Sequence, residues 1–260
     1  MDKICIVGGG ASGMMAAIQA KTKDNEVILL EKNDRVGKKI LATGNGKCNL
    51  GNENLSVDCY YSKNGSFVEQ VLKRYDTESA VSFFASIGLK VRSKNGYLYP
   101  YAEQASVVLD VLRMELEHRS ILVKPGVQIT DCIPLKKKRG FQLKTSEGKS
   151  YEADRVILAC GGPASLKEGG KDGYNILQKL GLKTYPLVPG LVQLRTDGKE
   201  QKAMSGVRCK ASLQLFTDGI QQGSEQGELQ LTDYGISGIP VFQLSRVAAY
   251  ALRNRKSVMV

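Results

Sequence analysis

The stretch KICIVGGGASGMMAAIQAKTKDNEVILLEKN, residues 3–33, carries the most informative pattern in this chain of 260 residues. An apolar segment, a glycine-rich turn, an alanine-rich segment and a second apolar segment follow one another, and the last ends on Glu31. The order predicts a βαβ unit, with strands at 4–7 and 27–30 and a helix that ends at Ala20. An acid eighteen residues beyond the last glycine completes the fingerprint of a dinucleotide site.

Each glycine of the GxGxxG turn has a separate mechanical task. Gly8 permits the tight turn, Gly10 lets the backbone approach a pyrophosphate, and Gly13 allows the helix to lie close to the strand. The amino terminus of the helix offers unpaired N–H groups and a partial positive charge to the same pyrophosphate. Glu31 can accept hydrogen bonds from the ribose hydroxyls of an adenosine. The alternative is a structural turn beside a solvated glutamate, and the fingerprint alone does not distinguish NAD from FAD.

Composition favours a globular protein with one large domain, or one domain and part of another, since 42% of the residues are hydrophobic. No apolar run approaches the roughly 18 residues of a membrane span, and the amino terminus lacks the pattern of a signal peptide. We therefore expect a cytoplasmic protein with no membrane partner. The cysteines at 5, 48, 59, 132, 160 and 209 contain no CxxC pair and no zinc spacing, which predicts reduced thiols and no metal site.

The formal net charge of +11 is spread along the whole chain. Its densest run, residues 136–139, lies between two strand-like segments, where a solvated hairpin tip is expected. Because no aromatic stacking platform accompanies the charge, we expect no nucleic-acid partner. A phosphate-bearing cofactor uses a few such cations.

Two later glycine pairs extend the candidate site toward a flat ring. In KKILATGNGKCNL, residues 38–50, the glycines allow close packing against a ring, while Asn45, Lys47 and Asn49 supply donors for carbonyl oxygens and phosphate. This loop suits an isoalloxazine. In ADRVILACGGPA, a strand at 155–159 ends in a double glycine, which can pass under a cofactor at the carboxyl edge of a parallel sheet. A plain strand-to-loop turn is the alternative for the second pair.

Five motifs together resemble one family of flavoproteins, the NAD(P)/FAD-dependent oxidoreductases. They are the glycine turn at 8–13, GKKILATGNGKCNL, NGYLYPYAEQASVVLDVL, ILACGG and LTDYGISGIPVFQLS. This family includes the aminoacetone-oxidase-like proteins and the bacterial 3-dehydro-bile-acid reductases. The resemblance runs in order along nearly the whole chain, and ATGNGKCN and DYGISG are more specific than the glycine turn.

The resemblance implies an α/β fold, a Rossmann-like FAD-binding domain of the glutathione-reductase type interrupted by an inserted β-barrel and helical domain. Residues 1–189 are expected to form the FAD-binding part and residues 190–260 the start of the insertion. The alternating runs LVQLRT, ASLQLFTDG and GELQLTDYG fit a barrel, and PVFQLSRVAAYALRN fits a helix. The segment with which the family returns to the FAD domain is not found before Val260. We therefore expect a C-terminally truncated chain, in which residues 1–260 alone hold FAD weakly.

The resemblance also implies the cofactor contacts. The pyrophosphate would be held by the turn, the adenosine ribose by the acid and the lysine after it, and the ribityl chain and ring by the loop from Lys38 to Asn49. Val127 fits a strand that meets adenine, and the double-glycine strand completes the cradle. The full set is Gly8, Gly10, Ala11, Ser12, Gly13, Glu31, Lys32, Lys38, Gly44, Asn45, Gly46, Lys47, Cys48, Asn49, Val127, Ala159, Gly161 and Gly162.

The expected reaction is reduction of bound FAD by NAD(P)H, followed by reduction of an activated C=C bond in a small molecule such as a steroid-like or bile-acid-like enone. The candidates for the proton donor are Tyr234, Tyr101 and Cys48. The single histidine, His118, is expected to end a helix and favour its dipole, which argues against a Ser-His-Asp hydrolase. A flavin-dependent amine oxidase and a non-catalytic flavin- or nucleotide-binding remnant remain the alternatives. The sequence indicates neither the catalytic residue nor the oligomeric state.

Overall fold

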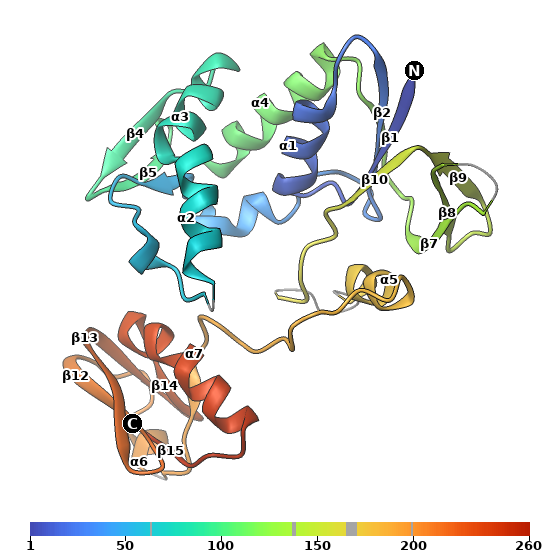
Figure 1. The fold of residues 1–260 in the computed structure, drawn as a ribbon. Helices are drawn as coiled ribbons and strands as arrows, with labels where there is room; N and C mark the ends of the chain where they lie inside the picture. The colour runs from blue at the N-terminus through green and yellow to red at the C-terminus, as the bar shows by residue number, and fades with distance from the viewer. Residues whose placement is uncertain (63, 137–138, 165–170, 199) are drawn as a thin grey trace. The chain divides into compact units, whose positions relative to one another are not determined.

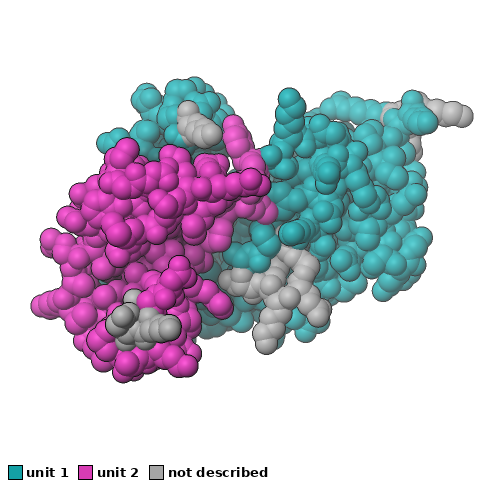
Figure 2. All heavy atoms as spheres, turned by 90° about the horizontal axis from the view of Figure 1, so that it is seen from below, with its two compact units in different colours: residues 1–184 teal, residues 185–260 magenta. Residues whose placement is uncertain are grey.

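A computed structural model of the chain describes residues 1–62, 64–136, 139–164, 171–198 and 200–260. The chain forms two compact units, Met1–Thr184 and Tyr185–Val260, which are coloured separately in Figure 2. Residues 182–190 contain neither helix nor strand, and the boundary predicted after residue 189 falls in this segment.

A four-stranded parallel sheet forms the centre of the first unit (Figure 1). Its strand order is β10-β1-β2-β6. The bounds are β1 Asp2–Val7, β2 Asn25–Leu30, β6 Leu122–Lys124 and β10 Arg155–Leu158, with helices α1 Ala11–Ala20 and α4 Ala105–His118. The predicted βαβ unit is confirmed, because α1 ends at Ala20 and β1 pairs with β2 in parallel. The predicted helix end at His118 is confirmed as well.

Alternate residues of β1 and β2 belong to two different cores, as the period of a strand requires. Ile6 and Leu29 are fully buried in a core that also contains residues of α1 and α4. Cys5 and Ile28 belong to the other core, with residues of β7, β8 and α5. The parallel strands are therefore covered on both faces, which explains their continuous apolar sequences. Burial raises the pKa of Cys5 to about 12, so this thiol stays protonated.

Two antiparallel sheets are formed by segments that lie between strands of the central sheet in sequence, one between β2 and β6 and the other between β6 and β10. One has the order β3-β5-β4 and the other β7-β8-β9. The remaining bounds of the first unit are η1 Ile40–Gly46, β3 Gly51–Asn52, η2 Val57–Cys59, α2 Gly65–Arg74, α3 Thr77–Ser86, β4 Val91–Lys94, β5 Tyr97–Pro100, β7 Ile129–Pro134, β8 Phe141–Thr145, β9 Ser150–Ala153 and α5 Asp172–Lys179. The predicted basic hairpin tip falls between β7 and β8, and residues 137–138 lie outside the described part of the chain.

The second unit is a five-stranded sheet with the order β11-β14-β13-β12-β15, against which α7 packs. Its bounds are β11 Leu194–Arg195, α6 Glu200–Ala203, β12 Arg208–Thr217, β13 Ile220–Thr232, β14 Gly235–Ser237, α7 Ile239–Arg253 and β15 Val258–Met259. The prediction of a strand through LVQLRT was too long. Only Leu194 and Arg195 pair, because β14 is itself short and offers partners to these two residues alone.

All six cysteines are free thiols, as predicted. Within the described ranges, no helix combines the length and the apolar composition needed to cross a membrane.

Candidate functional site

A cavity of about 430 Å³ opens at the carboxyl ends of β1, β2 and β10. This edge of a parallel sheet is where open α/β folds bind their ligands. Its lining residues come from the glycine turn, the end of β2, the segment before η1, the β6–β7 connection, the end of β10 and the start of α5. They are Val7, Gly8, Gly9, Gly10, Ala11, Ser12, Leu30, Glu31, Lys32, Asn33, Arg35, Gly37, Lys38, Lys39, Ile40, Thr43, Val127, Gln128, Ile129, Ala159, Cys160, Gly161 and Asp172.

The glycines of the turn divide into two that the fold requires and one that leaves room for a ligand. Gly8 has φ of 106°, and an added Cβ would lie 2.5 Å from the carbonyl oxygen of Ala159. A Cβ on Gly13 would lie 1.8 Å from the carbonyl oxygen of Gly8. Gly10 lines the cavity, and a Cβ there would meet no atom within 4 Å. The open approach at Gly10 fits a ligand that comes close to the backbone.

The amino terminus of α1 is not capped by a side chain. Gly10 occupies the N-cap position without a side-chain hydrogen bond, and the first turn contains no acidic residue. Ala11 and Ser12 line the cavity at this end of the helix. Unpaired N–H groups at a helix amino terminus bind anions, so this edge of the cavity suits a phosphate or pyrophosphate.

Glu31 is a buried carboxylate at the end of β2, with 6% of its surface exposed. One oxygen, Oε2, accepts the Gly9 backbone N–H at 2.5 Å. The other, Oε1, accepts the Asn33 backbone N–H at 2.8 Å and the Asn33 side-chain amide. A carboxylate has about four acceptor sites. Glu31 therefore ties the glycine turn to the end of β2 and retains acceptor capacity toward the cavity.

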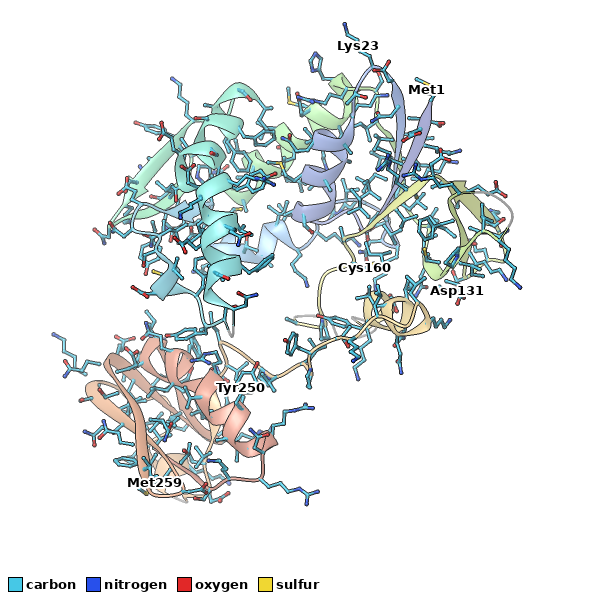
Figure 3. The ribbon with its side chains drawn as sticks, in the orientation of Figure 1. Met1, Lys23, Asp131, Cys160, Tyr250 and Met259 are labelled. Atoms are coloured by element: carbon cyan, nitrogen blue, oxygen red, sulfur yellow. The ribbon has the colours of Figure 1, made fainter. Side chains whose placement is uncertain are left out.

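An ion pair crosses the rim of the cavity between β2 and α5. The Lys32 Nζ lies 2.8 Å from the Asp172 Oδ2, and both residues line the cavity. Gly173 follows on α5, where an added Cβ would lie 2.9 Å from the Cβ of Cys160. Figure 3 labels Cys160 between β10 and α5. Burial, followed by the nearby Asp172 carboxylate, raises the pKa of the Cys160 thiol, so the cavity holds a neutral thiol here.

The predicted ring loop, Lys38 to Asn49, is only partly at the cavity. Lys38 lines it and is paired with Asp34, and Lys39 lines it while donating to the Ala164 carbonyl oxygen at 3.1 Å. The later members, Gly44, Asn45, Gly46, Lys47, Cys48 and Asn49, are not among the lining residues.

Val127 lines the cavity, but not from a strand as predicted. It lies in the connection between β6 and β7. A turn at Gly126 separates it from β6, and its N–H donates to the Glu31 carbonyl oxygen at 2.8 Å. Ala159 and Gly161 also line the cavity. Gly162 does not, although its carbonyl oxygen accepts from Lys39 Nζ at 3.5 Å.

The three candidate proton donors lie outside the cavity lining. Cys48 is buried in the core of the first unit. Tyr101 has 66% of its surface exposed, and the guanidinium of Arg92 lies 5.8 Å from its ring centroid. Tyr234 belongs to the second unit, where its hydroxyl donates to Gln193.

Several lining residues were missed by sequence reasoning. Gly9 occupies an unspecified position of the GxGxxG pattern, although its N–H donates to Glu31, the acid at the end of the βαβ unit. Arg35 follows the βαβ unit, just before the predicted loop from Lys38 to Asn49, in a segment without periodicity. Asp172 opens a helix far along the chain, and only folding brings it to Lys32. The acid at the first turn of an amphipathic helix was the available signal for Asp172.

The parallel sheet, the uncapped helix and the buried acid define a Rossmann-type nucleotide-binding domain followed by a second, β-rich unit. The chain belongs to the HI0933-like family. Residues 2–220 match the HI0933-like protein Rossmann domain, and residues 188–260 match the HI0933-like protein barrel and H2TH domain.

Two relatives illustrate the range of this similarity. The chain is 43% identical to a 3-dehydro-bile acid delta(4,6)-reductase of Clostridium scindens, over 100% of this chain and 64% of that protein. It is 29% identical to a ribosomal RNA dihydrouridine synthase of Haemophilus influenzae, over 92% of this chain and 60% of that protein. The chain thus spans less than two thirds of the length of either relative.

Among solved structures, the open conformation of a flavocytochrome c3 fumarate reductase has a similar fold. The TM-score is 0.50 at 15% identity, with 80% of this chain and 46% of that chain covered.

Proposed function

We propose that the first unit binds FAD and that the protein it belongs to is an FAD-dependent oxidoreductase. The observation that carries the proposal is the cavity at the carboxyl edge of the parallel sheet, where open backbone at Gly10 faces the same space as the uncapped start of α1 and the buried Glu31. These groups match the pyrophosphate and ribose of an adenine dinucleotide.

Each group has a defined role in holding the dinucleotide. The N–H groups at the start of α1 and the backbone at Gly10 take the pyrophosphate. Glu31 accepts the ribose hydroxyls with the acceptor capacity left by its backbone partners. Lys32 and Val127 line the adenosine end, and Ala159 and Gly161 lie on the β10 side. The loop from Lys38 to Asn49 is assigned to the ribityl chain and the ring.

The chemistry that FAD supplies when bound is two-electron hydride transfer. We assign the substrate by its chemistry, a C=C bond conjugated to a carbonyl group. The similarity to a 3-dehydro-bile acid delta(4,6)-reductase supports an alicyclic enone as the substrate. NAD(P)H is the electron donor in this proposal. Tyr234, Tyr101 and Cys48 are the candidate proton donors.

A second substrate is favoured by a specific observation, the similarity to ribosomal RNA dihydrouridine synthases. A dihydrouridine is a uridine whose ring C=C bond, conjugated to a carbonyl, has been saturated. The formal net charge of +11 suits a polyanionic partner. This candidate departs from the expectation of no nucleic-acid partner, which rested on the lack of an aromatic stacking platform. The two substrates share a reaction type and differ in size and charge.

An anaerobic half-reaction separates these proposals. NADH or NADPH is added to the FAD-loaded protein, and the band at about 450 nm is followed as it bleaches. A 3-oxo steroid with a conjugated double bond, or a uridine-containing ribosomal RNA fragment, is then added. Recovery of the band with the steroid alone supports the enone reductase, and recovery with the RNA alone supports the second candidate. Recovery with neither, after complete bleaching, would remove both substrates.

A further inference from the structure

The loop Gly44–Asn49 has an unusual backbone, and it begins inside η1, where Gly44 and Asn45 depart from helical φ and ψ. Gly44, Asn45, Gly46 and Cys48 have positive φ values of 54°, 54°, 81° and 58°. Residues other than glycine enter this left-handed region at a cost, and asparagine tolerates it better than cysteine. A loop that holds two such residues needs support from its surroundings, and strained backbone of this kind is typical of ligand contacts.

Part of the support comes from within the loop and from its carboxyl end. The Cys48 N–H donates to the Thr43 carbonyl oxygen at 3.1 Å, and the Leu50 N–H donates to the Leu98 carbonyl oxygen at 2.8 Å. The Cys48 side chain is buried in the first core, with 8% of its surface exposed. The loop is therefore fixed at Cys48 and at β5, while Lys47 lies on the remaining stretch, between the end of η1 at Gly46 and Cys48.

A single carboxylate pins this remaining stretch. Glu103 lies between β5 and α4, 56 residues from Lys47, and its Oε2 is 2.7 Å from the Lys47 Nζ. Its other oxygen, Oε1, is paired with Arg92 of β4. Arg92 in turn lies over the ring of Tyr101. The carboxylate is mostly covered, with 20% of the side chain exposed, and Glu103 itself has φ of 50°.

We propose that Glu103 is a positioning residue that holds the loop Gly44–Asn49 in its left-handed conformation for contact with the flavin ring. This inference rests on the proposed function, because it takes the loop as the part of the chain that meets the ring. Glu103 joins Lys47 to the β4–β5 hairpin through both carboxylate oxygens. Without it, the Lys47 ammonium loses its partner, and the loop relaxes from a conformation that its own residues disfavour.

The alkylation rate of the native Cys48 thiol measures how often the loop opens, so no reporter residue has to be introduced. We compare the apoprotein with Glu103→Gln, which keeps the side-chain size and removes the charge. The matched control is Glu147→Gln, which breaks the exposed pair between Glu147 and Lys149. Iodoacetamide alkylation is followed by mass spectrometry of the peptide that contains Cys48. We expect Glu103→Gln to raise the alkylation rate of Cys48 about tenfold, as a lower cost of local opening requires, and the control to leave it unchanged.

The FAD-loaded forms test the contact with the ring. Glu103→Gln is expected to raise the FAD dissociation constant about tenfold and to alter the shape of the bound flavin band at about 450 nm. A merely structural role would lower the melting temperature and leave the spectrum of the bound flavin unchanged.

The outcomes are distinguishable. Unchanged Cys48 alkylation overturns the pinning of the loop by Glu103. Faster alkylation with unchanged FAD affinity and spectrum overturns the contact with the ring and leaves the proposed FAD site intact. Failure of the unsubstituted protein to bind FAD overturns the proposed function, and the positioning role falls with it.

Discussion

Two glycine-to-alanine substitutions in the same turn are expected to have different effects. Gly13→Ala should lower the stability of the fold, and Gly10→Ala should weaken ligand binding. Gly13→Ala places a methyl group 1.8 Å from the Gly8 carbonyl oxygen, so helix α1 or the turn must move. Overpacking of this kind costs about 1–3 kcal/mol, while replacing a helical glycine by alanine returns about 0.5–1 kcal/mol. Because the added methyl group meets backbone, the upper end of the overpacking cost applies, and the net loss in the free energy of unfolding is about 2–2.5 kcal/mol.

Gly10→Ala is expected to behave in the opposite way. The methyl group meets no atom within 4 Å, and the backbone has φ of −77°, which alanine adopts freely. Alanine is a poorer N-cap than glycine, but it also reduces the entropy of the unfolded chain by about 0.4–1 kcal/mol, and these effects offset each other. The methyl group instead occupies space at the cavity, where we assign the pyrophosphate. We expect at least about a tenfold loss in FAD affinity, or about 1.4 kcal/mol.

The assay combines urea unfolding of the two apoproteins with FAD titration. Gly13→Ala should lower the unfolding midpoint and Gly10→Ala should leave it nearly unchanged, while Gly10→Ala weakens FAD binding. The reasoning is refuted if Gly10→Ala binds FAD as tightly as the unsubstituted protein, since the open space at Gly10 would then lie away from the ligand.

Three further predictions concern the surroundings of the cavity. Glu31→Gln leaves one buried backbone donor without its charged acceptor, so the free energy of unfolding of the apoprotein should fall by about 1.5–3 kcal/mol and the FAD affinity should fall as well. Urea unfolding and FAD titration measure the two effects. The control Glu26→Gln, on the exposed side of the same strand, should change neither. Because burial raises the pKa of Cys160, its alkylation should be slow at neutral pH and accelerate as the pH rises, and saturating FAD should suppress it in peptide mapping. The hydrogen bond from Lys179 lowers the pKa of Asp131, which is labelled in Figure 3. The stabilisation from this bond is therefore present above the unfolded-state pKa of about 4 and is lost as the pH falls through the lower folded-state pKa. Asp131→Asn should lower the melting temperature at pH 7 and have no effect on it below both pKa values.

The βαβ unit was predictable because its information is local. Strand periodicity, the glycine spacing and the acid at the end of β2 all lie within residues 3–33, and the structure agrees with the predicted bounds to within a few residues. The buried partners of Glu31 were not predicted, because a GxGxxG pattern treats Gly9 as a free position. Gly9 donates its N–H to Glu31, and this hydrogen bond forms only when β1 and β2 pair.

Contacts between residues far apart in the sequence could not be predicted from local sequence patterns. The pairs Lys32–Asp172 and Lys47–Glu103 join segments that no periodicity connects. Val127 was assigned to a strand because the family resemblance places KPGVQITDC there. In the structure its N–H donates to the Glu31 carbonyl oxygen, and the pairing of β7 starts only at Ile129. The short β11 was overestimated for a related reason, since a strand extends only as far as its neighbour offers partners.

Titration of the purified protein with FAD, followed by the absorption spectrum of the bound fraction, tests the central claim most directly. We predict one FAD per chain, with bands at about 370 and 450 nm and with binding weakened by Gly10→Ala and by Glu31→Gln. Binding of NAD in place of FAD, or FAD binding that is indifferent to both substitutions, would contradict the assignment of this cavity as the flavin site.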